Sequence, residues 1–472
     1  MRDYSFGNFL HQLRTRSGLT QFQLGTLVGV SDKAVSKWEN GSAKPQSGIL
    51  SKLGEVLGVS VDELLSCKYH SPSPSGVIGV FAMKKQLWNK ALFALRDTYG
   101  EVSPTEILNR YLTEQVELED TDMIVYWDML AGLTAEAKKY GEHLRLRGGV
   151  GASLVAYLLG ATDVNPLSPH RYCPVCHRVE FDDTVCDGWD LPSRICTCGA
   201  TMEGDGHGIP FETYRHVVRR NTSFDLSVSP DFFEGAKAFV ESYFRDCDLL
   251  PTAQTEQGTV SFSVKSPCSS CTVTLCADEE FGRYKRLEQK TGVAFGDVPF
   301  RCPEIPQAFA SGDTVGIPEF RTGMPKEILR AVSPAGFGEL IQILGLSHGT
   351  GTWTDNGELL VKEGKSIQDI IAYRDDVFRV VRQALLKKRI ADTGCAYKIM
   401  EDTRKGRYVA NKMTDAGRAM MLEMGLEEWF LESISKIRYL FPKAYGVTCV
   451  RIAAILMWYK INYPTEFESA VV

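Results

Sequence analysis

The chain has 472 residues, of which 44% are hydrophobic, and its formal net charge is −6. At roughly 100–200 residues per domain this length predicts about two to four domains, and the apolar fraction is sufficient for packed cores. A protein that wraps long stretches of nucleic acid needs a strongly basic surface, so the acidic balance excludes that class and allows only local nucleic-acid contact.

The first helical region has the pattern of five short helices in about 65 residues. Thr20 and Gln23 form a capping-box signature at the start of the second helix. Ser31 is placed to cap a third helix that runs through Trp38, and Gly41 is placed to end it. We therefore expect residues 1–67 to fold as an all-α domain.

A linker and a larger body follow. Residues 68–76 (KYHSPSPSG) contain two Ser-Pro pairs and no apolar periodicity, which predicts an extended linker. The pattern is mainly helical from Val77 to Arg147 and mixed over 210–300, where VSFSV and TVTLC are typical of strands. After Arg301 helical patterns return, notably over Ser366–Arg389 and Glu427–Tyr459.

Two terminal features concern location. The opening MRDYSFGNFLHQLR lacks the apolar core of a signal peptide, and the longest apolar run near the other end, Ile452–Trp458, is too short to span a bilayer. We expect a cytoplasmic protein without a membrane segment.

Thirteen cysteines in a chain expected in the cytosol favour metal ligation over disulfides. Two close pairs about 20 residues apart suit a tetrahedral structural zinc site, with buried apolar cysteines as the alternative. The four expected ligands are Cys173, Cys176, Cys196 and Cys198. A second group, Cys268, Cys271 and Cys276, leaves a second metal site open.

The string TQFQLGTLVGVSDKAVSKWENG (Thr20–Gly41) resembles the helix-turn-helix of the lambda-repressor/Cro-like (XRE) family, over about residues 5–66. The resemblance implies that the third helix enters the major groove of double-stranded DNA, and that the protein binds as a homodimer to two half-sites. By position it implies base contacts from Asp32, Lys33, Ser36 and Lys37, and phosphate contacts from Gln21 and Asn40. It also implies a structural ion pair between Arg14 and Glu39. The alternative is a domain that serves only in dimerisation or protein docking.

Several strings after residue 103 resemble the palm and fingers of the C-family bacterial replicative DNA polymerase, PolC type. They are VNPLSPHRYCPVC (164–176), DGHGIPFETY (205–214), GIPEF (316–320), GLSHGT (345–350), KIMEDTRKG (398–406) and FPKA (441–444). The resemblance implies a mixed α+β reduced palm over 77–300, with a zinc-binding insert over 172–201, and mainly helical fingers over 301–472. We expect the other modules of that family to have no room in this chain. Where that family has Cys-x-x-Cys, the second cysteine pair is Cys-x-Cys, so Cys186 and His177 are candidate replacement ligands.

The catalytic positions that the resemblance identifies are altered. Two-metal phosphoryl transfer needs clustered carboxylates, and the family places an Asp-x-Asp pair after the IPFETY string. Here Ser223 stands at the first aspartate and only Asp225 remains, while Thr274 stands at the third aspartate position. The resemblance therefore implies a palm without catalytic residues.

The segments that the resemblance assigns to phosphate binding keep some of their residues. The family's serine loop reads RGGVGAS here, which keeps Arg147 and Ser153. The fingers keep cations suited to a triphosphate, with a solvated basic turn as the alternative. These candidates for nucleotide binding are Arg404, Lys405, Arg407 and Lys443.

Three functional hypotheses follow. The first is a transcriptional regulator whose catalytically degenerate polymerase body binds nucleotide, primer-template DNA or a replisome protein. The second is an active minimal DNA polymerase, in which Asp225 and a further carboxylate such as Asp278 or Glu279 hold magnesium. The third is a decoy from a mobile element that interferes with replication.

Overall fold

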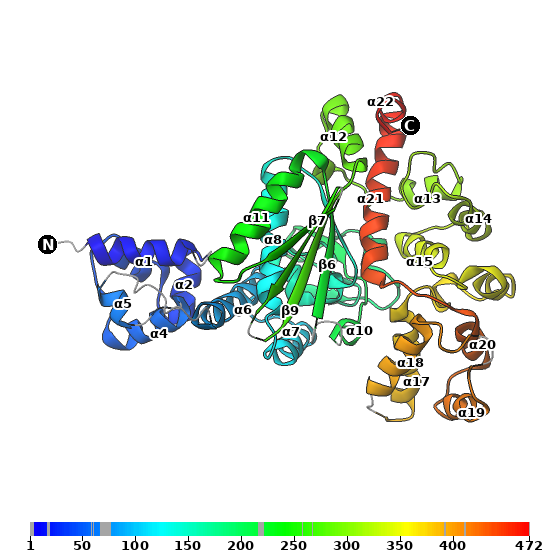
Figure 1. Ribbon diagram of the computed structural model, residues 1–472, viewed down its shortest axis with the longest axis horizontal. Coiled ribbons are helices and arrows are strands. Elements are labelled where there is room, and N and C mark those ends of the chain that lie inside the picture. Colours follow the sequence, from blue (N-terminus) through cyan, green and yellow to red (C-terminus); the bar gives the residue numbers. More distant parts are fainter. Residues whose placement is uncertain are drawn as a thin grey trace.

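The computed structural model describes residues 4–16, 19–57, 59, 61–66, 77–215, 221–256, 258–266, 268–390, 393–409 and 412–471. A helical domain lies at one end, followed by a body that combines sheets and helices (Figure 1). This arrangement confirms the predicted fold class. The linker predicted over 68–76 lies outside the described residues.

The N-terminal domain contains the five predicted helices. They are α1 (Tyr4–Arg16), α2 (Gln21–Val28), α3 (Asp32–Glu39), α4 (Ser47–Leu57) and α5 (Val61–Ser66). The capping box is present, because the Gln23 N–H donates to Thr20 Oγ1 at 3.1 Å and the Thr20 N–H donates to Gln23 Oε1 at 2.7 Å. Gly29 ends α2 with a φ of 78°, which favours glycine, and Ser31 caps α3.

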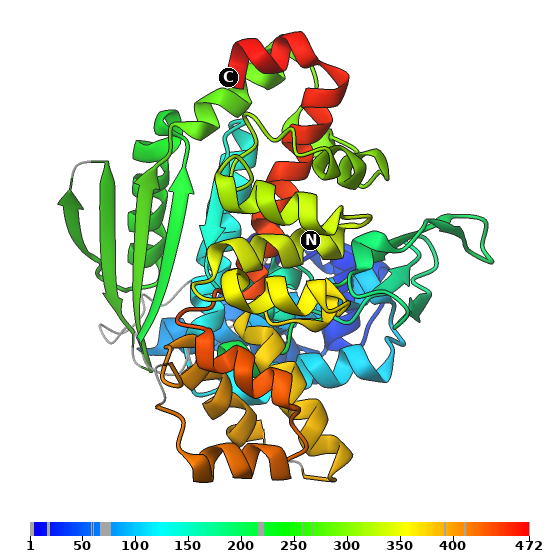
Figure 2. The same ribbon diagram turned by 90° about the vertical axis from the view of Figure 1, so that its right-hand side faces the viewer.

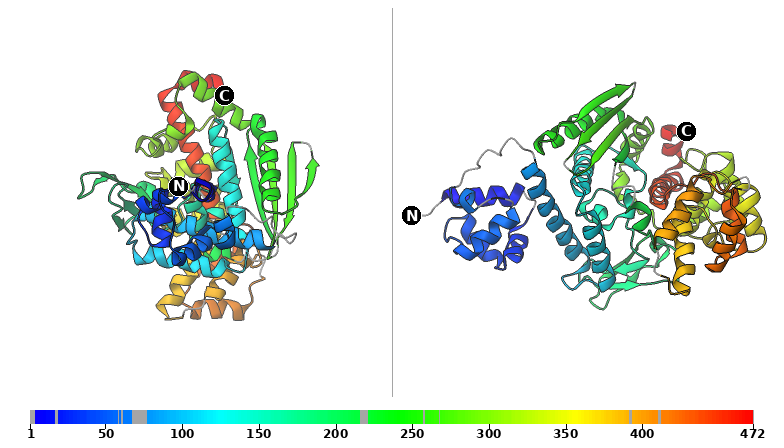
Figure 3. Two further views of the ribbon diagram at one scale, coloured as in Figure 1. Left: turned by 90° about the vertical axis from the view of Figure 1, so that its left-hand side faces the viewer. Right: turned by 60° about the horizontal axis from the view of Figure 1, so that its bottom comes forward.

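Helix α6 (Val77–Tyr99) joins this domain to the body by packing in two directions. Ala91, Leu95 and Tyr99 are buried in the core of the body. Phe93 points elsewhere and is buried in the apolar core of the helical domain. On the same side as Phe93, seven residues earlier, the Gln86 amide donates to the carbonyl of Leu57 at 2.6 Å. The helical domain is therefore docked on α6, at one end of the molecule (Figure 3).

A five-stranded sheet in the order β1-β6-β9-β8-β7 is the centre of the first part of the body. Its strands are β1 (Leu144–Arg147), β6 (Asn221–Val228), β7 (Thr252–Glu256), β8 (Thr259–Lys265) and β9 (Ser270–Ala277). Strands β8 and β9 contain the VSFSV and TVTLC segments, so those predictions are confirmed. Strand β1 was not predicted, because its four residues LRLR closely follow a long helical pattern.

The two faces of this sheet differ sharply. Phe224, Phe262 and Val273 are fully buried on one face, where α8 (Met123–Lys139) and α11 (Phe233–Asp246) pack. The alternate residues of β6, β8 and β9 are mostly serine and threonine; most of them are exposed or half-buried, but Ser227 is fully buried. Figure 2 shows the sheet (green) at one side of the molecule, apart from the yellow and orange helices. One face is therefore core, and the other is polar and partly exposed.

The cysteine-rich segment forms a small four-stranded sheet in the order β3-β2-β5-β4. Its strands are β2 (His170–Tyr172), β3 (Val179–Phe181), β4 (Arg194–Ile195) and β5 (Thr201–Asp205). All pairings are antiparallel, and the turns β2-to-β3 and β4-to-β5 each carry one cysteine pair. This topology brings the two pairs together.

The rest of the body is mainly helical. Its α-helices are α7 (Thr105–Leu118), α9 (Leu154–Leu159), α10 (Glu212–Arg215), α12 (Glu280–Thr291), α13 (Glu304–Ala310), α14 (Gly323–Val332), α15 (Phe337–His348), α16 (Glu358–Lys362), α17 (Arg374–Lys387), α18 (Thr393–Arg404), α19 (Asp415–Glu423), α20 (Glu428–Lys436), α21 (Lys443–Asn462) and α22 (Pro464–Val471). The two long helical patterns predicted after residue 366 are interrupted. The first breaks before Arg374, and the second breaks over 437–442, where Tyr439 forms a β-bridge with Thr350 and Pro442 then starts α21.

Helix α21 runs through the middle of the body, with β1 on one side and α13 and α15 on the other (Figure 1). Among the described helices it alone is long and apolar enough to cross a membrane, but 67% of its apolar window is buried inside the molecule. One such helix is weak evidence for a membrane span, and its burial is typical of a core helix.

Candidate nucleic-acid interface, metal centre and sheet face

Helix α3 presents a polar face to solvent. Asp32, Lys33 and Lys37 are exposed and Ser36 is half-buried, while Val35 and Trp38 face the core. These positions follow helical spacing, because residues four apart lie one above the other. The Asp32 carboxylate accepts the Lys33 backbone N–H at 2.8 Å. The four residues that the sequence assigned to base contacts therefore share one accessible side of α3.

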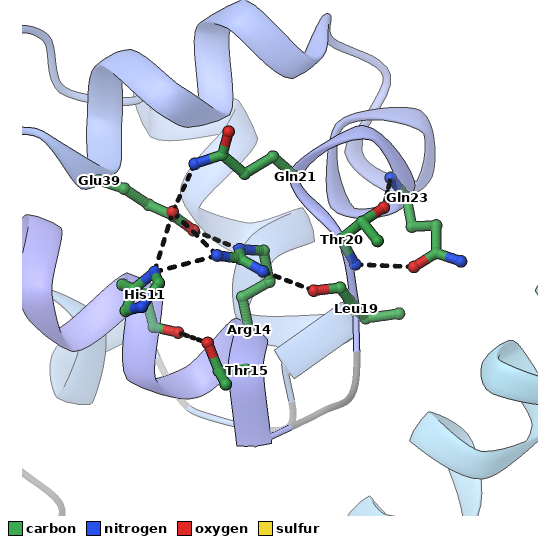
Figure 4. A network of polar contacts seen from close by, with 8 residues as sticks. All are labelled: His11, Arg14, Thr15, Leu19, Thr20, Gln21, Gln23 and Glu39. Atoms are coloured by element: carbon green, nitrogen blue, oxygen red, sulfur yellow. Dashed lines mark hydrogen bonds and ion pairs between the residues drawn. The ribbon is translucent and has the colours of Figure 1, made fainter.

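Glu39 is the centre of a polar network that fixes α1, α2 and α3 together (Figure 4). Its carboxylate accepts from Arg14 Nε at 2.5 Å and from Gln21 Nε2 at 2.8 Å, and it lies 3.2 Å from His11 Nδ1. Burial would raise the pKa of Glu39, but these hydrogen bonds outweigh it and lower the pKa. The ion pair expected between Arg14 and Glu39 is present.

The two residues assigned to phosphate contacts also have partners within the domain. The Gln21 amide donates to Glu39, and the side-chain oxygen of Asn40 accepts the Ser42 backbone N–H at 3.0 Å. Each amide group has a further N–H, so these bonds leave the phosphate assignments as predictions.

The four cysteines of the small sheet form a compact cluster. Their sulfur atoms all lie within 4.8 Å of one another, and Cys173–Cys198 and Cys176–Cys196 are each 3.4 Å apart. Four thiolates on one zinc ion, with Zn–S distances of about 2.3 Å, place their sulfur atoms about 3.8 Å apart. The donor set and its spacing therefore fit zinc, and four protein ligands leave no position for a reactive water.

The other candidate sulfur and imidazole ligands lie elsewhere. His177 has its Nδ1 atom 3.2 Å from the carbonyl of Thr98, and Cys186 lies near Lys443 and Arg379. The Cys-x-Cys pair thus brings both its sulfurs to the cluster without a replacement. Within the described ranges, Cys268, Cys271 and Cys276 do not meet as a group of three ligands.

The accessible face of the large sheet brings together the three positions that the polymerase resemblance identified. In the parallel pairing of β6 with β9, Asp225 is opposite Thr274 and Ser223 is opposite Thr272. Arg147 on β1 is opposite Asp225 on its other side, and its guanidinium donates to Ser227 Oγ at 3.0 Å. Asp225 thus has Thr274 and Arg147 as its two neighbours in the strand register, and the assignment of Thr274 to the third aspartate position stays a prediction.

This face does not fit two magnesium ions. In the part of the chain that the structure describes, no group of three metal-ligating side chains includes Asp225. Asp278 lies four residues beyond Thr274, about 13 Å along the strand direction. Its carboxylate instead accepts from Arg145 Nη2 at 3.0 Å. Glu279 lies one residue further, so neither residue supplies the second carboxylate of the active-polymerase hypothesis.

Ser153 occupies a buried structural position. It is 0% exposed, it caps α9, and its hydroxyl donates to Glu114 Oε2 at 2.7 Å. Glu114 also accepts the backbone N–H groups of Leu154 and Val155. Direct contact of a nucleotide with Ser153 would have to break this network.

The cations expected to bind a triphosphate are paired with acids on α18. Glu401 accepts two bonds from Arg404, at 2.7 and 2.8 Å, and forms an ion pair with Lys405 at 2.6 Å, while Arg407 pairs with Asp402 at 2.7 Å. Burial would raise the pKa of Glu401, but the bonds from Arg404 and Lys405 lower it to about 2. Nucleotide binding by these cations stays a prediction, and a nucleotide there would compete with Glu401 and Asp402 for them.

Lys443 lies at the start of α21, and Glu319 lies near Arg145 of β1. Lys443 Nζ donates to the carbonyl of His207 at 2.6 Å. Glu319 lies 2.7 Å from His348 Nε2 and 3.7 Å from Arg145 Nη1. Sequence reasoning gave Glu319 and Arg145 no role, although Glu319 belongs to the GIPEF string and Arg145 is two residues from Arg147.

Comparison with family models divides the chain in the same way. Residues 10–64 match a helix-turn-helix model, residues 85–239 match the bacterial DNA polymerase III alpha NTPase domain, and residues 282–418 match the bacterial DNA polymerase III alpha subunit finger domain. The matched regions contain α3, the sheet strands β1 and β6, and the cations that pair with acids on α18, respectively.

Curated relatives agree with the two later matches. The chain is similar to the PolC-type DNA polymerase III of Ureaplasma parvum (31% identical, 79% of this chain, 32% of the relative), of Thermotoga maritima (28%, 79%, 34%) and of Lacticaseibacillus paracasei (26%, 85%, 33%). It spans about a third of the length of each. The chain thus carries an N-terminal XRE-type helix-turn-helix domain, followed by NTPase and finger domains of the DNA polymerase III alpha subunit that are similar to those of PolC-type polymerases.

Proposed function

We propose that this chain is a sequence-specific DNA-binding protein that regulates transcription, and that its polymerase-like body binds a nucleotide, primer-template DNA or a replication protein without catalysing nucleotide transfer. The single observation that carries the non-catalytic part is that, among the residues the structure describes, Asp225 on the accessible face of the large sheet belongs to no group of three metal-ligating side chains. Two-metal catalysis needs several carboxylates around one pair of cations. One carboxylate between Arg147 and Thr274 does not meet that need.

The DNA-binding part is supported by the exposed polar side of α3. Lys33 and Lys37 carry donors suited to guanine, and Asp32 carries an acceptor suited to cytosine. Gln21 and Asn40 complete the proposed contacts at the phosphates. We further propose that the protein acts as a homodimer in the cytoplasm, that its four-cysteine cluster holds a structural zinc ion, and that magnesium is relevant only if the body is active.

The DNA-binding proposal is tested by selecting bound sequences from a random duplex library and then footprinting them. Lys37→Ala should weaken the selected site by about 1–3 kcal/mol and relax the preference at one position. Lys138→Ala, an exposed lysine on α8 in the body, is the matched control and should leave the footprint unchanged. Absence of any enriched sequence would overturn the regulatory function.

A second candidate function, an active DNA polymerase, is favoured by the matches to the NTPase and finger domains. Primer extension with magnesium or manganese and all four deoxynucleotides separates the two. We expect no extension from folded protein with its zinc bound. Extension that Asp225→Ala abolishes would establish the enzyme and overturn the non-catalytic proposal.

A further inference from the structure

The two edges of the five-stranded sheet have different surroundings. The edge strand β1 is covered by α21, which packs against it. The other edge strand, β7, pairs only with β8 among the described residues, and all five of its residues are exposed. Figure 2 shows the sheet (green) at one side of the molecule, with no helix or further strand beyond it. Strand β7 therefore has a free edge.

The backbone groups on this free edge belong to Ala253 and Thr255. The Ala277 N–H donates to the carbonyl of Gly258 at 3.0 Å, so Gly258 and every second residue after it direct their backbone groups towards β9. The residues of β8 between them direct their backbone groups towards β7. Their partners on β7 are Thr252, Gln254 and Glu256. Ala253 and Thr255 consequently direct both N–H and C=O away from β8.

This edge lacks the features that usually prevent pairing with another chain. Soluble proteins protect sheet edges with lysine, proline, a β-bulge or a covering segment. The sequence of β7, TAQTE, contains no lysine and no proline, and its register with β8 runs without a bulge. Its one charged residue, Glu256, lies at the end of the strand. Strand β7 can therefore accept a further strand.

We infer that β7 pairs with β7 of a second copy of this chain, in an antiparallel register with Gln254 on the two-fold axis. In this register Ala253 is opposite Thr255 of the second copy, and the two exchange both of their N–H···O=C bonds. Glu256 is opposite Thr252 of the second copy. Like charges therefore do not meet, and each threonine hydroxyl can donate to a carboxylate.

A neighbouring register fits less well. Centred on Ala253, it would place Pro251 opposite Thr255 of the second copy, and proline has no N–H to donate. The register centred on Gln254 instead places every outward backbone group of β7 in a hydrogen-bonded pair. This inference rests on the homodimer proposed above and specifies its interface.

The test is mild oxidation of the full chain carrying Gln254→Cys, with mass spectrometry of the peptide that contains position 254. The two copies of this position would form a non-hydrogen-bonded pair with Cα atoms about 4.5 Å apart, which suits a disulfide. Thr252→Cys is the matched control, on the same strand and equally exposed. Its two copies would lie about 13 Å apart, too far for a disulfide. We expect about tenfold more self-linked peptide from Gln254→Cys.

A second variant removes one outward N–H. Proline is tolerated on an edge strand where its nitrogen faces solvent, so Ala253→Pro should leave the pairing of β7 with β8 intact. Added to Gln254→Cys, it should lower the yield of self-linked peptide about tenfold, because each copy loses a donor to the other. An unchanged melting temperature shows that the variant is folded.

Equal self-linking of Gln254→Cys and Thr252→Cys would overturn the inference, and so would self-linking that Ala253→Pro leaves unchanged. A footprint over two half-sites without the disulfide at position 254 would retain the homodimer and move its contact elsewhere. A footprint over a single half-site would instead contradict the homodimer itself.

Discussion

Glu39 connects the first three helices of the N-terminal domain through its side chain. It is 9% exposed and bonded to residues of α1 and α2. Glu39→Ala would leave the guanidinium of Arg14, itself 12% exposed, without its acid. We expect the opening free energy of α1–α3, measured by hydrogen exchange in the full chain, to fall by about 2 kcal/mol. Thr15→Ala, which removes only an exposed hydroxyl bonded to the His11 carbonyl at 2.8 Å, should change it little. Equal effects of the two variants would contradict this role.

The pair of Glu319 and His348 predicts a pH dependence. Hydrogen bonding to His348 lowers the pKa of Glu319, and the same contact raises the pKa of His348 although burial opposes it. The histidine contribution is full below its ordinary pKa of 6.5 and is lost as the pH rises through its raised value. The glutamate contribution is present above 4.5 and is lost as the pH falls through its lowered value.

The melting temperature of the full chain should therefore decline above neutral pH, and His348→Gln should flatten that decline. The variant isolates this histidine because it keeps a hydrogen-bonding side chain but cannot titrate. If the unmodified protein and His348→Gln showed parallel curves from pH 6 to 8, the ion pair would have no part in the pH dependence.

At the scale of elements, α6 connects the helical domain to the body by packing against both. Phe93 is 7% exposed and belongs to the core of the helical domain, although it is part of a helix whose other side is buried in the body. Phe93→Ala should loosen the helical domain from the body, since truncation of a buried phenylalanine costs about 3–5 kcal/mol in a packed core. X-ray scattering should show a larger radius of gyration. Asp97→Ala, exposed on the same helix, is the control, and equal radii for the two variants would show that Phe93 does not dock the domain.

Local chemistry made some elements predictable from the sequence. The cap residues Thr20 and Ser31 fixed the starts of α2 and α3, and alternating apolar residues marked β8 and β9. Strand β1 and the break before α21 could not be read in this way, because both depend on distant partners: β1 on β6, and the break on Thr350.

Among the candidate sites, too, only those that depend on local sequence could be predicted. The cysteine cluster could be predicted because the two cysteines of each pair are close in sequence. The buried bond of Ser153 to Glu114 and the pairing of Arg404 with Glu401 could not, because a residue type does not reveal whether its charge or hydroxyl is already engaged.

For the whole molecule, we expect the proposed zinc ion to stabilise the small sheet and therefore the protein. The buried apolar neighbours of the cysteine cluster are few, Met202 foremost, so the small sheet has little core of its own. We expect purified protein to contain one zinc ion per chain, and chelation to expose four reactive thiols and lower the melting temperature. Cys198→Ala should reduce the zinc content, whereas Cys247→Ala, away from the cluster, should not. Metal-free protein with an unchanged melting temperature would contradict a structural zinc.

The central position of α21 has a consequence for synthesis on the ribosome. The helical domain draws its core from residues 6–64 and Phe93, so it is complete once the first hundred or so residues have emerged. The body cannot close until α21, which packs between β1 and α15, has also emerged. Domains generally fold in the order in which they are made. We therefore expect the helical domain to fold, and to be able to bind DNA, several hundred residues of translation before the body folds. During that interval the apolar sides of α13 and α15 that pack against α21 lack this neighbour, and nascent chains should be clients of chaperones until residue 462 is released.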